Sequence, residues 1–371
     1  MMKKKMILLL FLIISVFTLS SCSKQEKYHK DFIYFDTTIE ITIYSENSDE
    51  ATSAFSYAKE TLYLYDNLCN RYEEENDNAV GVYTINKEAG KEVKISKELF
   101  DLIKFSIDNS DLVLDSSSSS PFTIGIGKVS DIWHELFSNY NQASSCESPE
   151  VGALPNDYTI NKTYNTDTSL IILNEDELTI KIPSDMSLDL GGVAKGYTSE
   201  IISSYFNQNG INYVINAGSS NIKTNIGNPS RKNNAYIVGL INPNYGYCSN
   251  DDNLLYAKLN VPLNKAVVTS GDYQRFFIVN GKRYFHILDA KTNMPVETDL
   301  RSITIITSDG GIGDILSTSL FMIGLDKAYE YVSNKDDLEA IFFTVNNEIY
   351  MTDGIKDLVT ITDGFAVKDY Q

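Results

Sequence analysis

Hydrophobic and polar residues follow two different periods along the chain. Ile39, Ile41 and Ile43 alternate with polar neighbours, which predicts a half-buried strand. Residues 51–68 instead carry apolar side chains at helical spacing, which predicts an amphipathic helix. The same patterns predict further helices at 97–114, 193–208, 312–324 and 326–334, and strands at 169–173, 178–182, 302–307, 338–344 and 348–352.

These elements predict an α+β fold, because strands and helices are interspersed without a regular βαβ repeat. The Asn280-Gly281 pair stands between two apolar segments, 276–279 and 283–288, and predicts a tight β-hairpin. Five serines at 116–120 predict an exposed loop, with a domain linker as the alternative. Residues 138–165 are rich in Asn, Ser and Glu and predict a long surface excursion. We expect one large domain of mixed sheets and helices.

The N-terminus has a different pattern. Three lysines at 3–5 precede an apolar run at 6–17 that is too short to span a bilayer comfortably, and LSSC follows at 19–22. This arrangement resembles a bacterial lipoprotein signal in which Cys22 is lipidated; an ordinary secretory peptide or an uncleaved anchor is the alternative. We therefore expect a signal peptide at 1–21, a lipidated cysteine and polar tether at 22–30, and a catalytic domain at 31–371, held by lipid on the extracytoplasmic side of the cell membrane.

The amino-acid composition and net charge argue against several classes of protein. The 371 residues are 43% hydrophobic and include 24 Tyr and 17 Phe, which argues against wholesale disorder. The formal net charge of −19 argues against a nucleic-acid partner, and removal of the three leader lysines would lower it to −22. Beyond Cys22, the cysteines Cys69, Cys146 and Cys248 contain no CxxC pair, so neither a zinc site nor a disulfide framework is indicated.

One candidate site lies in the segment SLDLGGVAKGY at 187–197. Alternation through Leu188 and Leu190 predicts a strand, Gly191 and Gly192 a tight turn, and the residues from 193 onward a helix. A glycine turn that opens a helix offers N–H groups and a positive dipole end to an anion, and Lys195 adds a full charge. The alternative is a plain turn without a ligand.

A second candidate site lies in GDILSTSLFMIG at 313–324. Asp314 and Thr318 are four residues apart, so on a helix their oxygens lie on the same face. A carboxylate with a hydroxyl and a few carbonyls or waters suits Mg²⁺. Alternatively, Asp314 is an N-terminal helix charge and Thr318 a residue at the edge of the core.

The third candidate segment, 267–296, combines hydroxyl groups and a possible base. Thr269 and Ser270 precede a glycine turn at Gly271, and His286 and Asp289 follow the predicted hairpin. His286 and Asp289 are three residues apart, so they would point to opposite faces of a strand unless the strand ends between them. A pair in which Asp289 orients His286 is therefore only one possibility. A structural histidine is the alternative.

Several segments together resemble the ApbE family of FAD-dependent protein FMN transferases, over nearly the whole chain from about residue 32. The resemblance rests on DLGGVAKGY, the NAG at 216–218, TSGDYQRFF, HILDAKTNMPV and GDILSTSLFMIG, in the family's order. It implies an ApbE-like, T-fold-related α+β domain. It also implies an enzyme that uses Mg²⁺ and transfers the FMN part of FAD to a threonine hydroxyl of an acceptor protein, releasing AMP.

The resemblance also implies roles for individual residues. Asp314 and Thr318 match the family's magnesium ligands, with the carbonyl of Ala194 as a third, while His286 and Asp289 match the HIxD motif that contains a candidate general base. The segments that match the flavin-nucleotide contact contain Gly191, Gly192, Lys195, Ser270 and Gly271. The implied acceptor is a flavin-carrying subunit of an electron-transport system, and the implied localisation agrees with an anchor at Cys22.

The sequence departs from the family pattern at several points. NAGSSNI places Ser219 and Ser220 where a permissive glycine is common, Pro121-Phe122-Thr123 lacks a common acidic residue, and Asn293 replaces a glycine. Asparagine tolerates a left-handed turn, so the last change is mild. Two other functions stay open: an FAD-hydrolysing lipoprotein without a protein acceptor, and a solute-binding lipoprotein, which would have two similar lobes.

Overall fold

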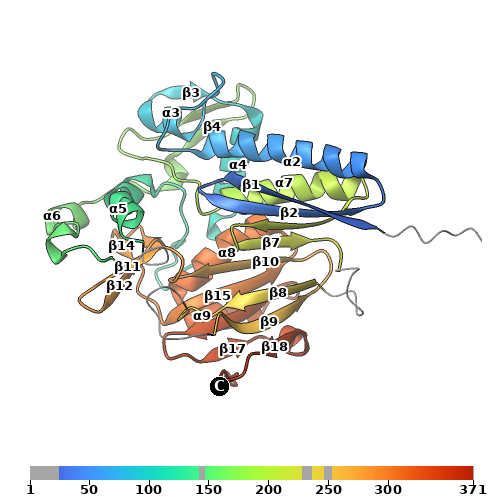
Figure 1. The fold of residues 1–371 in the computed structure, drawn as a ribbon. Helices are drawn as coiled ribbons and strands as arrows, with labels where there is room; N and C mark the ends of the chain where they lie inside the picture. The colour runs from blue at the N-terminus through green and yellow to red at the C-terminus, as the bar shows by residue number, and fades with distance from the viewer. Residues whose placement is uncertain (1–24, 142–146, 228–235, 246–252, 371) are drawn as a thin grey trace, which may run out of the picture.

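The structure, a computed structural model, describes residues 25–141, 147–227, 236–245 and 253–370 (Figure 1). Within these ranges no helix has both the length and the apolar character needed to cross a bilayer. The predicted signal peptide with Cys22, and the residues Cys146 and Cys248, lie outside the described part of the chain. The lipid anchor therefore stays a prediction.

An eight-stranded antiparallel sheet forms the centre of the molecule. Ile39, Ile41 and Ile43 point from one of its strands into the core and are almost fully buried. In spatial order the strands are β1 (Glu26–Tyr34), β2 (Thr37–Ser45), β6 (Asn212–Ala217), β7 (Asn221–Thr224), β10 (Ala266–Gly271), β15 (Leu300–Thr307), β16 (Glu339–Thr344) and β17 (Ile349–Met351).

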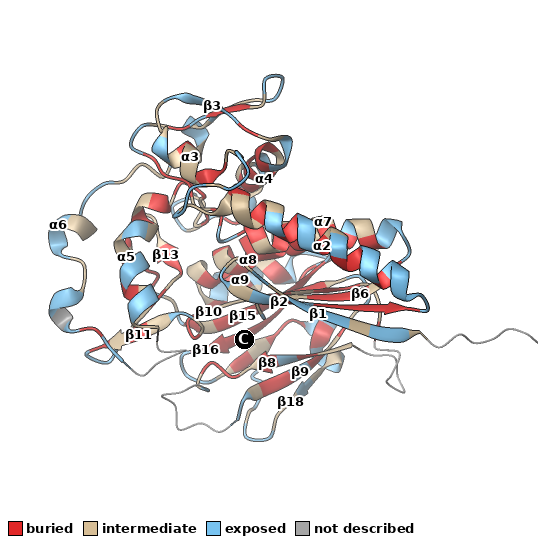
Figure 2. Cartoon of the chain, turned by 45° about the horizontal axis from the view of Figure 1, so that its top comes forward, coloured by how far each residue is buried: buried red, intermediate tan, exposed pale blue. Residues whose placement is uncertain are grey.

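The two faces of this sheet are covered differently. Four helices cover one face, with apolar residues turned toward the strands and polar residues toward solvent (Figure 2); they are α2 (Ser48–Cys69), α7 (Ala194–Gln208), α8 (Gly310–Ile323) and α9 (Leu325–Ser333). A small sheet packs on the other face through a separate apolar cluster; its strands are β8 (Tyr236–Ile241), β9 (Leu255–Val261) and β18 (Val359–Ile361). The part of the sheet formed by β10, β15, β16 and β17 is thus the middle of three layers, between the helices and the small sheet.

Two smaller groups of elements surround one end of the sheet. One packs around the end of α2 and consists of α3 (Val82–Lys87), α4 (Lys97–Asp108), β3 (Glu92–Lys94), β4 (Ile172–Asn174) and β5 (Thr179–Lys181). The other forms a cluster around Trp133 and contains α5 (Gly127–Asn139), β11 (Phe276–Val279), β12 (Lys282–Phe285), β13 (Leu288–Asp289) and β14 (Met294–Pro295). Short helical turns complete the connections: η1 (Ser110–Leu112), η2 (Val151–Ala153), α6 (Asp157–Ile160), η3 (Thr168–Leu170) and η4 (Asp353–Leu358).

The α+β class and most predicted elements are confirmed. The predicted hairpin is formed by β11 and β12, and both turn residues have positive φ, 52° at Asn280 and 78° at Gly281. The loop at 116–120 contains no helix or strand. The predicted helix at 97–114 ends at Asp108, and the strand expected at 169–173 begins only at Ile172.

Three predictions about local structure were wrong or incomplete. Residues 26–30, expected to be a tether, belong to β1, which pairs with β2 from Glu26 onward. Residues 187–190 are extended, but only Ser187 forms a bridge, to Ile126. Helix α5 was not predicted, although Val129, Trp133 and Leu136 are buried on it at helical spacing. The described part of the chain shares one central sheet, so it does not form the two lobes of a solute-binding protein.

Asn293 joins the α5 group to the loop before β4. It has a φ of 56°, and its side-chain amide donates hydrogen bonds to the carbonyl oxygens of Ile160, at 2.7 Å, and Lys162, at 2.8 Å. Its own carbonyl oxygen accepts a bond from the indole N–H of Trp133 at 2.8 Å. Since Trp133 is the protein's single tryptophan, its fluorescence reports directly on this junction.

We expect Asn293→Gly to lower the free energy of unfolding by about 1–3 kcal/mol, because two side-chain hydrogen bonds are lost while the backbone conformation stays accessible. Asn293→Ala should cost about 1 kcal/mol more, because alanine does not favour a left-handed φ. Urea unfolding followed by Trp133 fluorescence measures both values. The matched control is Asn280→Gly in the exposed hairpin turn; equal losses at 280 and 293 would refute the role of the Asn293 side chain.

Candidate functional site

Helices α7 and α8 approach each other closely at Gly196. A Cβ atom at this position would lie 2.2 Å from the carbonyl oxygen of Gly310 and 2.7 Å from Oδ2 of Asp314, so glycine is required here. The Gly196 backbone N–H donates a 2.7 Å hydrogen bond to Oδ2 of Asp314. The first turn of α7 therefore lies directly against this carboxylate, where the positive end of the helix dipole favours the anionic form.

Asp314 is a buried carboxylate, with 7% of the residue exposed. Its Oδ1 accepts a 3.0 Å hydrogen bond from the side-chain amide of Asn221 at the start of β7. Burial raises the pKa of Asp314 to about 6, because desolvation outweighs the opposing effects of the Lys195 charge and of the two hydrogen bonds. A divalent cation would supply the positive charge that this carboxylate lacks.

The other predicted cation ligands lie around Asp314. Thr318 lies one turn later on α8, and its hydroxyl is 3.4 Å from that of Ser270 in β10, which donates to Ser317 at 2.9 Å. Ala194 is the first residue of α7, and its carbonyl oxygen accepts a 2.7 Å hydrogen bond from the hydroxyl of Thr198 in addition to the helical bond from the backbone N–H four residues on. Hard oxygen donors of this kind suit Mg²⁺.

The turn before α7 differs in detail from its prediction. Gly191 and Gly192 form an exposed turn and the helix begins at Ala194, as expected. However, the Gly191 N–H donates to Oδ1 of Asp189 at 2.9 Å, and the Ala194 N–H donates to the carbonyl oxygen of Leu190 at 2.9 Å. Since these donors already have protein acceptors, the positive charge available to an anion here comes chiefly from Lys195.

Arg71, which the sequence analysis missed, holds the extended segment before this turn. Its guanidinium donates to the carbonyl oxygen of Leu188 at 3.2 Å and to that of Gly127 at 2.8 Å, and it forms a 2.9 Å ion pair with Asp131. Arg71 follows the end of α2, whereas Gly127 begins α5. One buried cation thus fixes the Gly191 turn relative to two helices.

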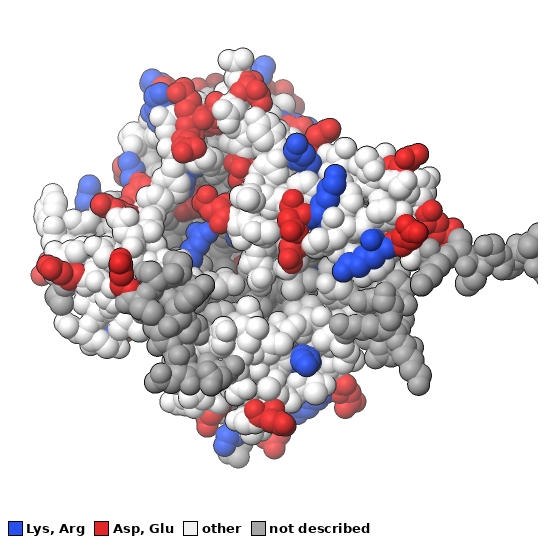
Figure 3. All heavy atoms as spheres, in the orientation of Figure 1, with Lys and Arg blue, Asp and Glu red and all other residues white. Residues whose placement is uncertain are grey.

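Two cations and an imidazole lie near one another, and one of the cations, Lys195, also acts on Asp314. Lys195 is half-buried and Arg275 is exposed, and neither forms a hydrogen bond or ion pair through its side chain with another described residue. Burial is the main cause that lowers the pKa of Lys195, and the Arg275 charge lowers it further. Figure 3 shows Lys or Arg side chains inside a hollow between the α5 group and the body of the molecule.

His286 is neutral at physiological pH. Burial, assisted by the charges of Arg275 and Lys195, lowers its pKa to about 3. Its Nδ1 is buried without a hydrogen-bond partner among the described residues, and its backbone N–H donates to the carbonyl oxygen of Arg275 at 3.2 Å. A neutral imidazole with a free ring nitrogen can accept a proton.

Asp289 contacts its own turn. Its Oδ1 accepts a 2.8 Å hydrogen bond from the Lys291 N–H, and its Oδ2 accepts a 3.2 Å bond from the Thr292 hydroxyl. It forms no hydrogen bond with His286 within the described ranges. The structure therefore brings together Asp314, Thr318, Ser270, Lys195 and His286, whereas Asp289 supports the loop that follows His286.

Gly271 and Asp272 fix the loop that carries Arg275. A Cβ at Gly271 would lie 2.5 Å from the Tyr273 ring, so only glycine fits there. The carboxylate of Asp272 is buried and forms a 2.7 Å ion pair with Arg301, which opposes the rise in its pKa caused by burial. Sequence reasoning missed Arg275 and Asn221, although both lie inside motifs that it used, TSGDYQRFF and NAGSSNI.

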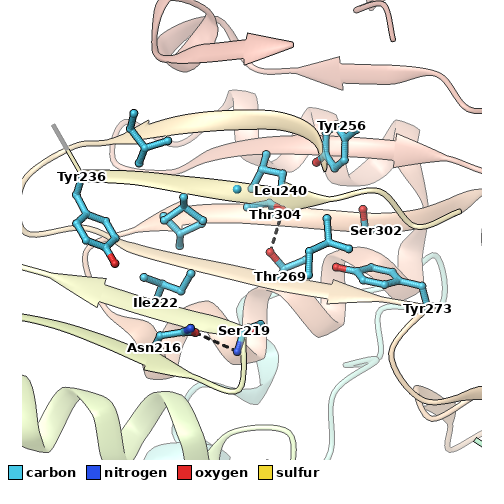
Figure 4. A pocket seen from close by; sticks show the side chains of 15 residues that line it. Asn216, Ser219, Ile222, Tyr236, Leu240, Tyr256, Thr269, Tyr273, Ser302 and Thr304 are labelled. Atoms are coloured by element: carbon cyan, nitrogen blue, oxygen red, sulfur yellow. Dashed lines mark hydrogen bonds between the residues drawn. The ribbon is translucent and has the colours of Figure 1, made fainter. Parts of the chain in front are cut away.

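A separate cavity of about 240 Å³ lies on the opposite face of the sheet, under β8 (Figure 4). Neutral hydroxyl groups line one end, including Thr269 and Thr304, whose oxygens are 2.9 Å apart. Adjacent strand residues point to opposite faces, so Thr269 faces this cavity while Ser270 faces α8. The cavity therefore does not contain the candidate cation ligands.

Comparisons with known proteins show which family and which folds this chain resembles. The model of the ApbE family matches residues 35–342. The FAD:protein FMN transferase of Klebsiella pneumoniae is 28% identical over 334 residues, which are 89% of this chain and 93% of that protein; the one from Haemophilus influenzae is 24% identical over 93% of this chain and 94% of that protein. The ApbE protein of Thermotoga maritima superposes with a TM-score of 0.72 at 21% identity, covering 90% of this chain and 99% of that one. The flavin transferase ApbE of Vibrio cholerae superposes with a TM-score of 0.70 at 18% sequence identity, with the same coverage of both chains.

We expect Asp314→Asn to change how stability depends on pH when cations are chelated. The wild-type carboxyl has a pKa of about 6 in the folded chain and an ordinary value of 3.8 in the unfolded chain, so its contribution to stability is fully present below pH 3.8 and is lost as pH rises to 6, by about 3 kcal/mol in total. The variant lacks this loss. Urea unfolding in EDTA from pH 4 to 7.5 should therefore show the variant gaining stability relative to wild type as pH rises; parallel curves would contradict the raised pKa.

Proposed function

The chain belongs to the ApbE family, and from this premise we propose that it is an FAD:protein FMN transferase that requires Mg²⁺. Its substrate is FAD, and the FMN part passes to a threonine hydroxyl of an acceptor protein while AMP is released. One observation carries the proposal: a buried carboxylate with hydroxyl neighbours lies near Lys195, which in turn lies near Arg275 and a neutral imidazole, and neither cation has an ion-pair partner among the described residues. Such a site combines oxygen ligands for a cation with positive charge for a pyrophosphate.

The residues present fit a magnesium ion. Asp314 is a buried carboxylate whose pKa stays raised despite the nearby Lys195 charge. The buried Oδ1 of the adjacent Asn221 has no hydrogen-bond partner in the described part of the chain. Asp314, Thr318 and the Ala194 carbonyl would hold the ion. When bound, it would neutralise phosphate charge and polarise a phosphoryl oxygen.

The cations of the site bind and orient the substrate. Lys195 and Arg275 attract the pyrophosphate of FAD, and their side chains are available because no protein carboxylate forms an ion pair with either in the described ranges. The hydroxyls of Ser270 in β10 and Thr318 in α8 lie 3.4 Å apart where this strand meets the helix. Positioning and charge neutralisation are the main contributions to a phosphoryl transfer.

His286 acts as the general base. It accepts the proton of the acceptor threonine while the threonine oxygen forms a bond to the phosphorus of the FMN half. The bond between this phosphorus and the bridging oxygen breaks, and that oxygen leaves with AMP. The neutral state of His286 at physiological pH provides the lone pair. Gly191 and Gly192 shape the nucleotide contact because their exposed backbones can approach a ligand closely, whereas Gly271 makes room for the Tyr273 ring.

We also propose that Cys22 carries a lipid that holds the enzyme on the extracytoplasmic side of the cell membrane. Because β1 begins at Glu26, three residues separate this cysteine from the folded domain. The acceptor is then a flavin-carrying subunit of an electron-transport system exposed on the same side. The leader at 1–21 and the LSSC sequence support this localisation.

We expect Asp314→Ala to abolish FMN transfer and EDTA to do the same to the wild type, because the pyrophosphate then faces a site without its cation. Purified protein is mixed with FAD, Mg²⁺ and candidate acceptors, and acceptor-bound flavin fluorescence is read on a denaturing gel. The control is Asp337→Ala, which removes an exposed carboxylate on another part of the surface. Undiminished transfer by Asp314→Ala would refute the cation site, and FMN release without acceptor labelling would indicate the hydrolase.

We expect His286 and Asp289 to differ in their contributions to the rate. His286→Ala should lower kcat by about 10²–10⁴-fold, the usual contribution of a general base. Asp289→Asn should lower it less than about tenfold, because an asparagine oxygen can still accept the Lys291 N–H that closes the turn. Steady-state FMN transfer measures both rates; an equal loss in the two variants would instead make Asp289 a catalytic partner of His286.

A further inference from the structure

We propose that Asn221 is the positioning residue of the cation site: its amide fixes the Asp314 carboxylate, and its side-chain oxygen accepts a hydrogen bond from a water ligand of the cation. This inference rests on the proposed function only for the existence of the cation. It assigns to Asn221 a role distinct from those of Asp314 and Thr318, which would hold the ion directly.

Asn221 is enclosed where β7 meets α8. It is the first residue of β7, it pairs with Val268 of β10, and none of its surface is exposed. Its side-chain nitrogen donates to the Gly310 carbonyl oxygen at 2.9 Å and to Oδ1 of Asp314 at 3.0 Å. A Cβ at Gly310 would lie 3.0 Å from the Asn221 oxygen, so a glycine at 310 lets the amide come this close.

These two bonds determine which way the amide points. Both acceptors, the Gly310 carbonyl and the Asp314 carboxylate, require a donor, so a flipped amide would place oxygen against oxygen at both contacts. Asn221 therefore uses both of its N–H groups on these acceptors. The side-chain oxygen of Asn221 therefore points away from these two acceptors, and the oxygen and nitrogen positions cannot be interchanged.

That oxygen has no donor among the described residues, although it is buried. Leaving a buried acceptor without a hydrogen bond costs about 1–3 kcal/mol, so a buried asparagine at this position calls for a donor beyond the described residues. Mg²⁺ usually keeps several of its waters, and such waters are strong hydrogen-bond donors. A water ligand of an ion bound at Asp314 supplies this donor.

The neutral amide also has a consequence for selectivity. An aspartate of the same shape at 221 would add a second carboxylate beside Asp314 and remove the donor that orients it. Ca²⁺ accepts more carboxylate ligands and a looser geometry than Mg²⁺. Asparagine therefore favours a small ion that keeps its water over a larger ion that sheds it.

The test measures cation binding in the absence of flavin. Mn²⁺ binding to the full chain is titrated by electron paramagnetic resonance, and Mg²⁺ and Ca²⁺ compete for the site. We expect Asn221→Ala to weaken Mn²⁺ affinity about 10–100-fold, which is the usual effect of removing an outer-shell partner. Asn221→Asp should instead shift the competition toward Ca²⁺ relative to Mg²⁺.

The matched control is Glu200→Gln. Glu200 accepts the Gly310 N–H at 2.6 Å and pairs with Lys223 at 2.8 Å, so this variant loosens the same end of α8 without touching Asp314. We expect its cation affinity to equal that of the wild type. Affinity within twofold of wild type in Asn221→Ala together with an unchanged Mg²⁺/Ca²⁺ preference in Asn221→Asp would overturn the proposal, as would an equal loss in Glu200→Gln.

The same titration separates this inference from the proposed function. If the wild type binds Mn²⁺ and Asn221→Ala does not change the affinity, the inference alone fails. If the wild type binds no cation, the magnesium part of the proposed function fails as well. If cation binding depends on Asn221 but no acceptor is labelled with FMN, the inference stands and the transferase proposal fails.

Discussion

The arrangement of the site depends on one close backbone contact, between α7 at Gly196 and α8 at Gly310. Because no Cβ separates the helices, the N–H of Gly196 reaches the Asp314 carboxylate, and Ala194 and Lys195 lie at the same end of α7. A side chain at position 196 would push the helices apart and separate these groups. Shape complementarity between two helices is therefore a precondition for the electrostatics of the site.

Burial of Asp314 is costly, and the fold compensates it incompletely. Its hydrogen-bond donors come from elements far apart in the chain, Gly196 in α7 and Asn221 in β7, and Lys195 lowers its pKa without restoring the ordinary value. A protein that needed only stability would be better served by an apolar residue here. The remaining electrostatic cost is what a bound cation would remove, so structural strain and proposed function coincide at this residue.

The sequence allowed us to predict those relations within the site that depend on a single helix, but few of the contacts between segments that are far apart in the chain. Helical spacing placed Asp314 and Thr318 on one face because that relation depends on a single helix. The role of Asn221 depends on the pairing of β7 with β10 and on a glycine 89 residues away in sequence, at 310, and no local pattern shows either. Strand β1 was missed because most of its residues are exposed, which leaves no hydrophobic alternation to detect.

The overall charge of the chain and the charge of the site have opposite signs, and this contrast explains why local geometry matters. At −19, the protein as a whole repels a pyrophosphate, and the Debye length of about 8 Å at physiological ionic strength limits that repulsion to short range. Lys195 and Arg275 lie near each other, and no described carboxylate forms an ion pair with either of them. Their two charges are fewer than the combined negative charge of Asp314 and a doubly charged substrate, and the divalent cation proposed at Asp314 would supply the difference.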